Sequence, residues 1–182
     1  MTTTRAVTNL CVLAVAVAVC GCGGGEDVNA RSLGMAKRLW QRAGILDYDL
    51  EWSSSGAREG HYKVRVRKGE VTDIQSIAAD GSTKPAHPGD PSYYGVDGLF
   101  RTIEADMDHC LDLVKAGADK GAHVLLRFWP DAELGYPRRY RRDVTGAVRP
   151  LEIDVIRFDP AAAAGSTGTK PGLSSDKVGP NP

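Results

Sequence analysis

Two stretches of this chain each combine an amphipathic helix with strands of alternating apolar and polar residues, and this pattern restricts the fold more than any other feature. In the first stretch, apolar residues recur every three or four positions over residues 33–43, and residues 46–52 then alternate strictly. In the second, a period of 3.6 residues runs through residues 96–114. Each stretch therefore predicts a helix followed by strands.

Local signals set the expected bounds of these elements. Ser32 can cap the first helix and Gly44 can end it, and Gly117 can end the second helix. Lys68-Gly69 predicts a tight hairpin turn. The remaining strands are expected at residues 61–67, 70–76, 123–129, 136–143 and 151–158.

The links between the expected strands are short, and this decides the fold class. A parallel crossover needs a dozen or more residues, so neighbouring strands must be antiparallel. The sequence predicts an α+β fold: one antiparallel sheet of about six strands with two helices on one face, in the order helix, three strands, helix, three strands. We expect a single domain over residues 33–158.

Opposite charges on the first two strands indicate their register. Residues 47, 49 and 51 are acidic and residues 63, 65 and 67 are basic. Both sets lie on the polar side of the alternation, so they should face each other across the antiparallel ladder.

Two stretches rich in Gly and Pro are expected to lack regular structure. Residues 79–95 hold six of these breakers, which predicts a long loop that is either a functional lid or slack. Residues 159–182 contain no aromatic side chain, and we expect them to form a disordered tail.

The N-terminus has the pattern of an export signal. Leu10 to Cys20 are eleven residues without a charge, too few to cross a hydrocarbon core of roughly 30 Å. Residues 1–21 are therefore interpreted as a signal peptide. Val19-Cys20-Gly21-Cys22 resembles the bacterial lipobox, which makes Cys22 the expected lipidated residue. Cys20 is the weaker candidate because Val19 would precede it, and an ordinary cleaved signal peptide is the alternative.

Lipidation predicts the location of the protein. Two or more acyl chains on one cysteine give stable anchoring, so we expect a membrane-anchored lipoprotein of the cell envelope, with residues 22–32 as a flexible tether. Gly23 after Cys22 favours the outer membrane in an organism that has one. The formal net charge of zero argues against nucleic acid as a partner.

Candidate chemistry is sparse. Asp106, Asp108, His109 and Cys110 form the densest titratable cluster, but three or four convergent metal ligands are not evident, so a solvated acidic helix face is favoured. Cys110 is the only cysteine of the mature chain outside the lipid site, and its place on the apolar stripe indicates a buried residue. We expect no metal, no cofactor and no catalytic residue. An enzyme built from distant residues such as His123, Asp143 and Asp106 is the alternative.

The most basic run is Arg138-Arg139-Tyr140-Arg141-Arg142. A strand places residues 138, 140 and 142 on one face and 139 and 141 on the other. Such a strip could contact an anionic glycan, a lipid headgroup or an acidic partner. A solvated strand that offsets the acidic helix is the favoured interpretation.

Several motifs resemble a family of small exported bacterial lipoproteins known only as a domain of unknown function. The matching residues are Leu39-Trp40, Ile45-x-x-Tyr48-x-Leu50, Val64-x-Val66-x-x-Gly69-x-Val71, Gly98-Leu99-Phe100-x-x-Ile103-Glu104 and Leu134-Gly135-Tyr136-Pro137 leading to Asp143. They cover most of residues 39–143 in order. The resemblance implies an envelope lipoprotein with an α+β domain and supplies no activity. Family members often carry cysteines after the first strand, where this chain has Ser53-Ser54-Ser55-Gly56.

The sequence thus favours a non-enzymatic, membrane-tethered binding or scaffolding domain. It would use the sheet face or the loop at 79–95 to contact a protein, peptide or glycan. An inhibitor of an envelope enzyme is an alternative, beside the enzyme described above.

Overall fold

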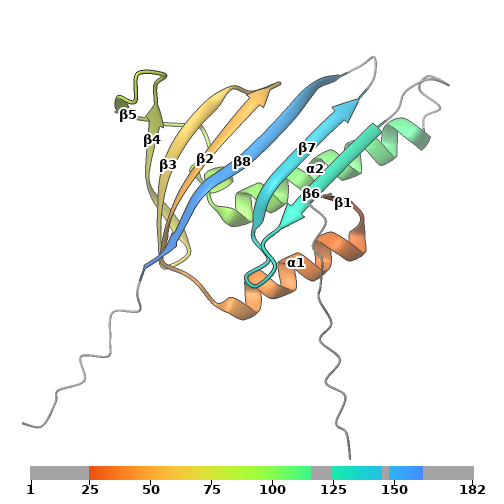
Figure 1. Ribbon diagram of the computed structural model, residues 1–182, viewed down its shortest axis with the longest axis horizontal. Coiled ribbons are helices and arrows are strands. Elements are labelled where there is room, and N and C mark those ends of the chain that lie inside the picture. The colour runs from red at the N-terminus through yellow and green to blue at the C-terminus, as the bar shows by residue number, and fades with distance from the viewer. Residues whose placement is uncertain (1–24, 116–123, 145–147, 162–182) are drawn as a thin grey trace, which may run out of the picture.

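One eight-stranded antiparallel sheet carries both helices on the same face (Figure 1). The structure is a computed structural model that describes residues 25–115, 124–144 and 148–161. Its elements in chain order are β1 (Glu26–Asp27), α1 (Ala30–Ala43), β2 (Tyr48–Gly56), β3 (Gly60–Arg67), β4 (Glu70–Ile77), β5 (Thr83–Pro85), the 3₁₀ helix η1 (Pro91–Tyr94), α2 (Val96–Lys115), β6 (Val124–Pro130), β7 (Pro137–Val144) and β8 (Val148–Pro160).

The predicted α+β class is confirmed, but the predicted count of about six strands and the predicted element order are wrong. The sheet order is β1-β6-β7-β8-β2-β3-β4-β5. The two additional strands are its edges: β1 pairs with β6, and β5 pairs with β4. They have two and three residues, too short for a period-two pattern to be visible in the sequence.

Both edge strands fall where the sequence predicted no regular structure. β1 and the first turn of α1 occupy residues 26–32, which were assigned to the tether. β5 and η1 lie inside the expected loop at 79–95. Both edges of the sheet are thus formed by very short strands, which is one way in which proteins limit edge-to-edge pairing.

Helix α1 begins earlier than predicted, because Asn29 rather than Ser32 is its N-cap. The Asn29 Oδ1 accepts from the backbone N–H groups of Arg31 and Ser32 at 3.0 and 2.9 Å. Ser32 reaches back instead, its Oγ accepting from the Asn29 N–H at 3.2 Å, which completes a capping box. Gly44 ends the helix in the left-handed region with φ of 60°, as predicted.

The core lies between the sheet and the two helices. Alternate residues of β2 and β3 point into it, including Tyr48, Leu50, Trp52, Val64 and Val66. Leu46 was predicted to share this buried side, but it is 58% exposed because β2 begins two residues later.

A corner between β6 and β7 fixes α1 against the sheet. Gly135 has a φ of 78°, and a Cβ there would lie 2.3 Å from the carbonyl oxygen of Ala36 in α1. The ring of the next residue, Tyr136, stacks on Phe158 with centroids 4.5 Å apart. Only glycine permits both this backbone conformation and this close approach.

Candidate functional site

The structure separates the titratable cluster at the middle of α2. Asp106 points toward the sheet, where its carboxylate accepts from the Tyr140 hydroxyl at 2.9 Å and from Arg142 Nη1 at 2.5 Å. Its side chain is only 13% exposed, so Asp106 does not belong to a solvated acidic face. Asp108 and His109 are exposed, as that interpretation predicted.

Cys110 is buried, as its position on the apolar stripe indicated. Burial raises the pKa of its thiol, and the nearby carboxylate of Asp106 raises it further. Because the thiolate is the reactive form, this surrounding makes Cys110 a poor nucleophile. Within the described residues, no group of three or more His, Cys, Asp or Glu side chains could hold a metal ion.

Two residues of the alternative enzyme site, Asp106 and Asp143, lie on opposite faces of the sheet. Asp143 forms an ion pair with Arg141 at 3.0 Å, on the outer face of the sheet, whereas Asp106 lies on the inner face with the helices. His123 lies outside the described residues.

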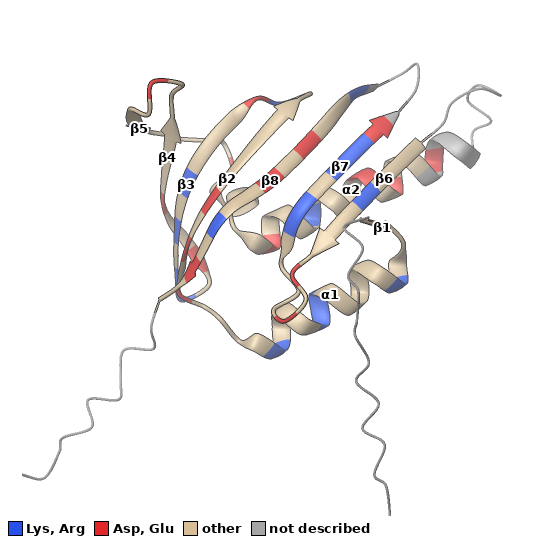
Figure 2. Ribbon diagram, in the orientation of Figure 1, with Lys and Arg blue, Asp and Glu red and all other residues tan. Residues whose placement is uncertain are grey.

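Most arginines in the basic run of β7 form ion pairs with acidic side chains. Arg139 contacts Glu152 and Asp154 of β8, the second at 3.3 Å. Basic residues of β7 lie beside acidic residues of β8 (Figure 2). On the inner face, Arg142 pairs with Asp106 of α2. The favoured interpretation, a solvated strand that offsets the acidic helix, fits Arg138, Arg139 and Arg141, which are exposed. It does not fit Arg142, which offsets the helix from a position only 13% exposed.

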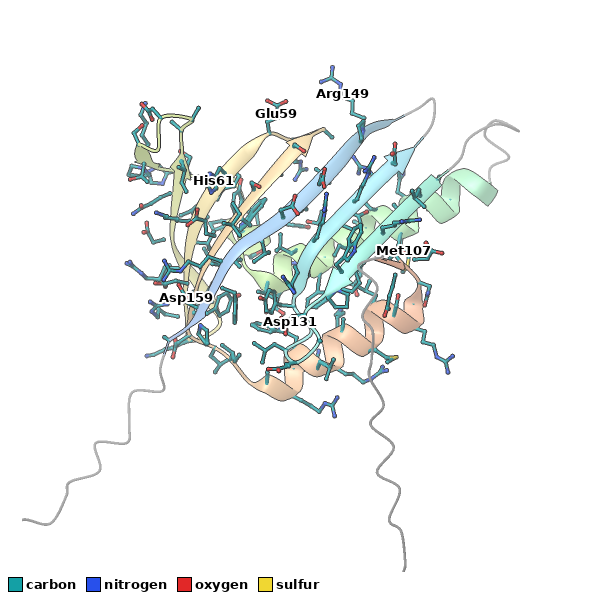
Figure 3. The ribbon with its side chains drawn as sticks, in the orientation of Figure 1. Glu59, His61, Met107, Asp131, Arg149 and Asp159 are labelled. Carbon is teal, nitrogen blue, oxygen red and sulfur yellow. The ribbon has the colours of Figure 1, made fainter. Side chains whose placement is uncertain are left out.

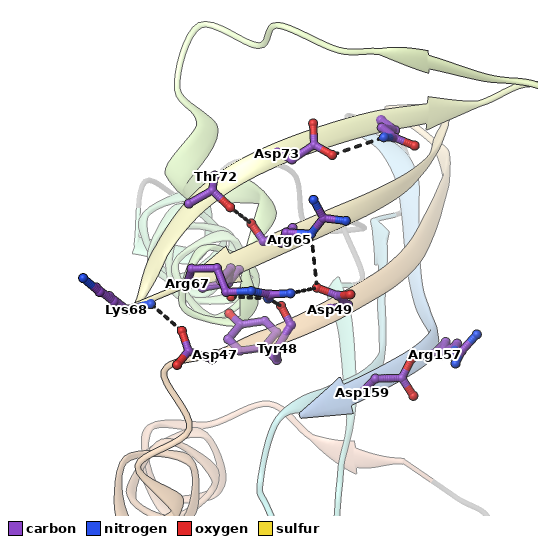
Figure 4. A network of polar contacts seen from close by, with 12 residues as sticks. Asp47, Tyr48, Asp49, Arg65, Arg67, Lys68, Thr72, Asp73, Arg157 and Asp159 are labelled. Atoms are coloured by element: carbon purple, nitrogen blue, oxygen red, sulfur yellow. Dashed lines mark hydrogen bonds and ion pairs between the residues drawn. The ribbon is translucent and has the colours of Figure 1, made fainter. Parts of the chain in front are cut away.

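The predicted register of β2 and β3 is confirmed. Asp49 lies opposite Arg65, and Glu51 lies opposite Lys63. The Oδ1 of Asp49 lies 2.8 Å from Arg67 Nη2 and 3.8 Å from Arg65 Nε (Figure 4). These are half-exposed pairs, each worth about 0–1 kcal/mol. The outer sheet face therefore largely satisfies its own charges.

One titratable pair on the outer face was missed by the sequence analysis. His61 Nε2 lies 2.8 Å from Glu51 Oε1, and Ser53 is the cross-strand neighbour of His61. Figure 3 labels His61 on β3. In the described structure the Ser53 hydroxyl is not hydrogen-bonded to the imidazole, so the nucleophile-to-base contact of a catalytic set is not formed.

A cleft opens on the inner face, at the end of the sheet where β2 turns into β3. It has a volume of about 450 Å³ and is lined by residues of β2, β3, η1, α2, β7 and β8. The aromatic and charged side chains that could contact a ligand there include Trp52, Tyr62, Tyr94, Arg58, Asp106 and Arg142. Glu59 and Arg149 project from the strand ends at this same end of the sheet (Figure 3). The volume is typical of small-ligand sites, which span roughly 300–1,000 Å³.

Aromatic rings form one wall of the cleft. The ring of Trp52 lies 4.9 Å from that of Tyr62 and 5.6 Å from that of Tyr94, and the two tyrosine rings meet edge to face at 5.0 Å. Trp52 Nε1 donates to the Tyr94 carbonyl oxygen at 3.1 Å, which ties η1 to β2. Burial raises the pKa of Tyr94, with a further contribution from Tyr62. The Tyr94 hydroxyl is therefore neutral at physiological pH.

The opposite wall carries the polar groups. Arg142 is held by Asp106 and by the Arg149 carbonyl oxygen, which accepts from Nη2 at 3.2 Å. Its Nε is buried and has no hydrogen-bond partner among the described residues. Arg58 also lines the cleft, near Tyr94, so the lining holds two guanidinium groups and one carboxylate and carries one net positive charge. This surrounding favours a ligand with an acceptor group, above all an anion.

Sequence reasoning could not have assembled this cleft, since its residues come from six separate elements. One signal was available: the loop at 79–95 was predicted to be a lid or slack, and its Tyr94 belongs to the aromatic wall.

No family model matches the chain. Comparison with curated proteins and with solved structures finds no match either. The resemblance to a lipoprotein family therefore stays a prediction. Neither helix in the described part of the chain is both long and apolar enough to span a bilayer.

Proposed function

We propose that the protein is a lipid-anchored, non-enzymatic binding domain of the bacterial cell envelope, and that the cleft between α2 and the sheet is its binding site. The observation that carries this proposal is the pairing of an aromatic wall with an arginine whose Nε is buried without a partner. A buried donor left unpaired costs about 1–3 kcal/mol. Because protein atoms cover the Arg142 Nε, a ligand acceptor recovers this energy only by shifting the Arg142 side chain.

The ligand that fits is a peptide or glycan unit with a flat apolar ring face and an acceptor group such as a carboxylate. The ring would pack against Trp52, Tyr62 and Tyr94. The acceptor would meet Arg142 or Arg58. Binding rather than catalysis is favoured because Asp106 and Arg142 are bonded to each other.

The outer sheet face is the weaker candidate. It is the surface that an inhibitor of an envelope enzyme would use, but its charged side chains largely pair among themselves. We therefore assign recognition to the cleft.

Site-specific photocrosslinking in intact cells tests this assignment. A benzophenone amino acid replaces Ala57, which lines the cleft, or Lys63, which lies on the outer sheet face. We expect a reproducible adduct from position 57 and none from position 63. The adduct should disappear in Ala105→Trp, which fills the cleft from α2, and persist in His109→Trp, one turn further along the helix. An adduct indifferent to Ala105→Trp would overturn the proposal.

The anchor has its own test. Cells are labelled with a fatty-acid analogue and the protein is isolated. Cys22→Ala should abolish labelling, whereas Cys20→Ala should retain it, because residue 22 is the expected acylation site. Equal labelling of the two variants would contradict the lipid assignment.

A further inference from the structure

Helix α1 carries an outward stripe that is basic and partly apolar. Arg31, Met35, Arg38 and Arg42 follow one another at spacings of four, three and four residues, which places them on one side of the helix. All four are exposed, Met35 by 53%. The opposite side of the helix is buried against the sheet through Leu33, Ala36 and Trp40.

The charge of this stripe is not balanced within the helix. α1 holds four basic residues and no acidic one, and Figure 2 shows only basic charges along it. The fourth, Lys37, lies off the stripe and is paired with Glu104 of α2 at 2.5 Å. The acids nearest in sequence lie outside the helix: Glu26 and Asp27 belong to β1, and Asp47 accepts from the Lys68 N–H at 2.7 Å. Three arginines and a methionine therefore form a positive surface with an apolar centre.

The distance to the proposed anchor is short. β1 begins at Glu26, only four residues after Cys22, and α1 begins four residues after that. Four residues reach at most about 14 Å when fully extended. A lipid on Cys22 would thus hold the start of β1 close to the membrane surface, and α1 with it. The flexible tether predicted over residues 22–32 is shortened, because β1 and the start of α1 occupy part of that range.

We propose that the α1 stripe docks on anionic lipid headgroups, so that the domain lies against the membrane through α1. This inference rests on the proposed lipid anchor. Arginine binds phosphate oxygens in a bidentate manner, and the exposed Met35 can enter the boundary between headgroups and acyl chains. Each basic residue near an anionic surface contributes about 1 kcal/mol, or roughly fivefold in the docked-to-free ratio.

Fluorescence quenching on vesicles tests the proposal with the processed full chain. A probe is attached at Met35→Cys, or at Lys63→Cys on the far sheet face, in a Cys110→Ser background. Vesicles of phosphatidylcholine alone, or with one third phosphatidylglycerol, carry a headgroup quencher. We expect quenching at position 35 and not at position 63, and much stronger quenching with phosphatidylglycerol than with phosphatidylcholine alone. Replacing Arg31, Arg38 and Arg42 by Gln should lower the docked-to-free ratio by roughly a hundredfold, as should high salt.

A matched triple variant on other exposed positions, Lys63→Gln, Arg127→Gln and Arg149→Gln with the probe at 35, should leave quenching unchanged. Quenching independent of lipid charge, or insensitive to the α1 substitutions, would refute docking through α1. Flotation with vesicles separates the two proposals. A chain that floats with neutral vesicles but is not quenched with anionic ones keeps its anchor and loses this orientation, whereas a chain that fails to float overturns the anchor itself.

Discussion

Replacing Tyr140 tests how strongly its hydrogen bond to Asp106 holds α2 against the sheet. Its ring is fully buried, and its hydroxyl donates to Asp106 at 2.9 Å. Tyr140→Phe removes one hydrogen bond to a charged group and leaves the ring in place, so no large cavity forms. Such a bond contributes about 1.5–3 kcal/mol, and we expect the free energy of unfolding to fall by about 2 kcal/mol.

Urea denaturation at pH 7 measures this change. With a slope near 2 kcal/mol per molar, the midpoint should fall by about 1 M while the slope stays constant. Tyr93→Phe is the matched control, because Tyr93 is 44% exposed and its hydroxyl makes no hydrogen bond within the described residues. It should change stability by less than about 0.5 kcal/mol.

The pH dependence gives a second, independent readout. Burial, the nearby Asp106 carboxylate and the hydrogen bond to it raise the pKa of Tyr140 above its usual value. The unfolded chain ionises at its ordinary pKa of about 10, so above that pH the wild type loses a part of its stability that Tyr140→Phe does not lose. Tyr48, whose pKa is also raised by burial, affects both proteins alike. Between pH 7 and pH 11 the gap between the two proteins should narrow by roughly 1.4 kcal/mol. A loss below 0.5 kcal/mol at pH 7, or a gap that widens at high pH, would refute the reasoning.

Three further outcomes are expected. Gly135→Ala should lower the free energy of unfolding, measured by urea denaturation, by more than about 2 kcal/mol. Gly81→Ala, at a similar φ of 81° but in open space, should lower it by about 1 kcal/mol. Equal losses in the two variants would contradict the contact of Gly135 with Ala36. Asp49→Ala should cost less than about 1 kcal/mol because its ion pairs are half exposed; a larger loss would show that the outer charges are structural. Cys110 should react with a disulfide reagent far more slowly in the native protein than in denaturant, with Cys110→Ser as background; equal rates would contradict its burial.

The sequence predicted those parts of the fold that depend on local chemistry. Gly44 ends α1 and Lys68-Gly69 turns β3 into β4, because positive φ values are needed there. The facing of Asp49 and Arg65 followed from alternation and charge. Where pairing begins was not predictable: Leu46 continues the alternation of β2, yet no strand partner reaches it.

Long-range geometry explains what the sequence could not show. Asn29 and Ser32 are both good capping residues, and only the position of β1 decides between them. Asp106 looked like one acid on a polar helix face until Tyr140 and Arg142, more than thirty residues later, were placed opposite it. Predicting the cleft would have required the relative positions of six elements at once.

The position of β8 has a consequence for how the chain acquires its structure. Among the described strands it is the last to leave the ribosome, yet it lies in the middle of the sheet, between β7 and β2. Until it arrives, β2 has an open edge and no strand joins the two halves of the sheet. A chain that emerges with its N-terminus first must wait, with β2 unpaired on one side, for β8. The open edge of β2 is therefore most exposed to aggregation in this interval, and that edge is where a chaperone would be needed.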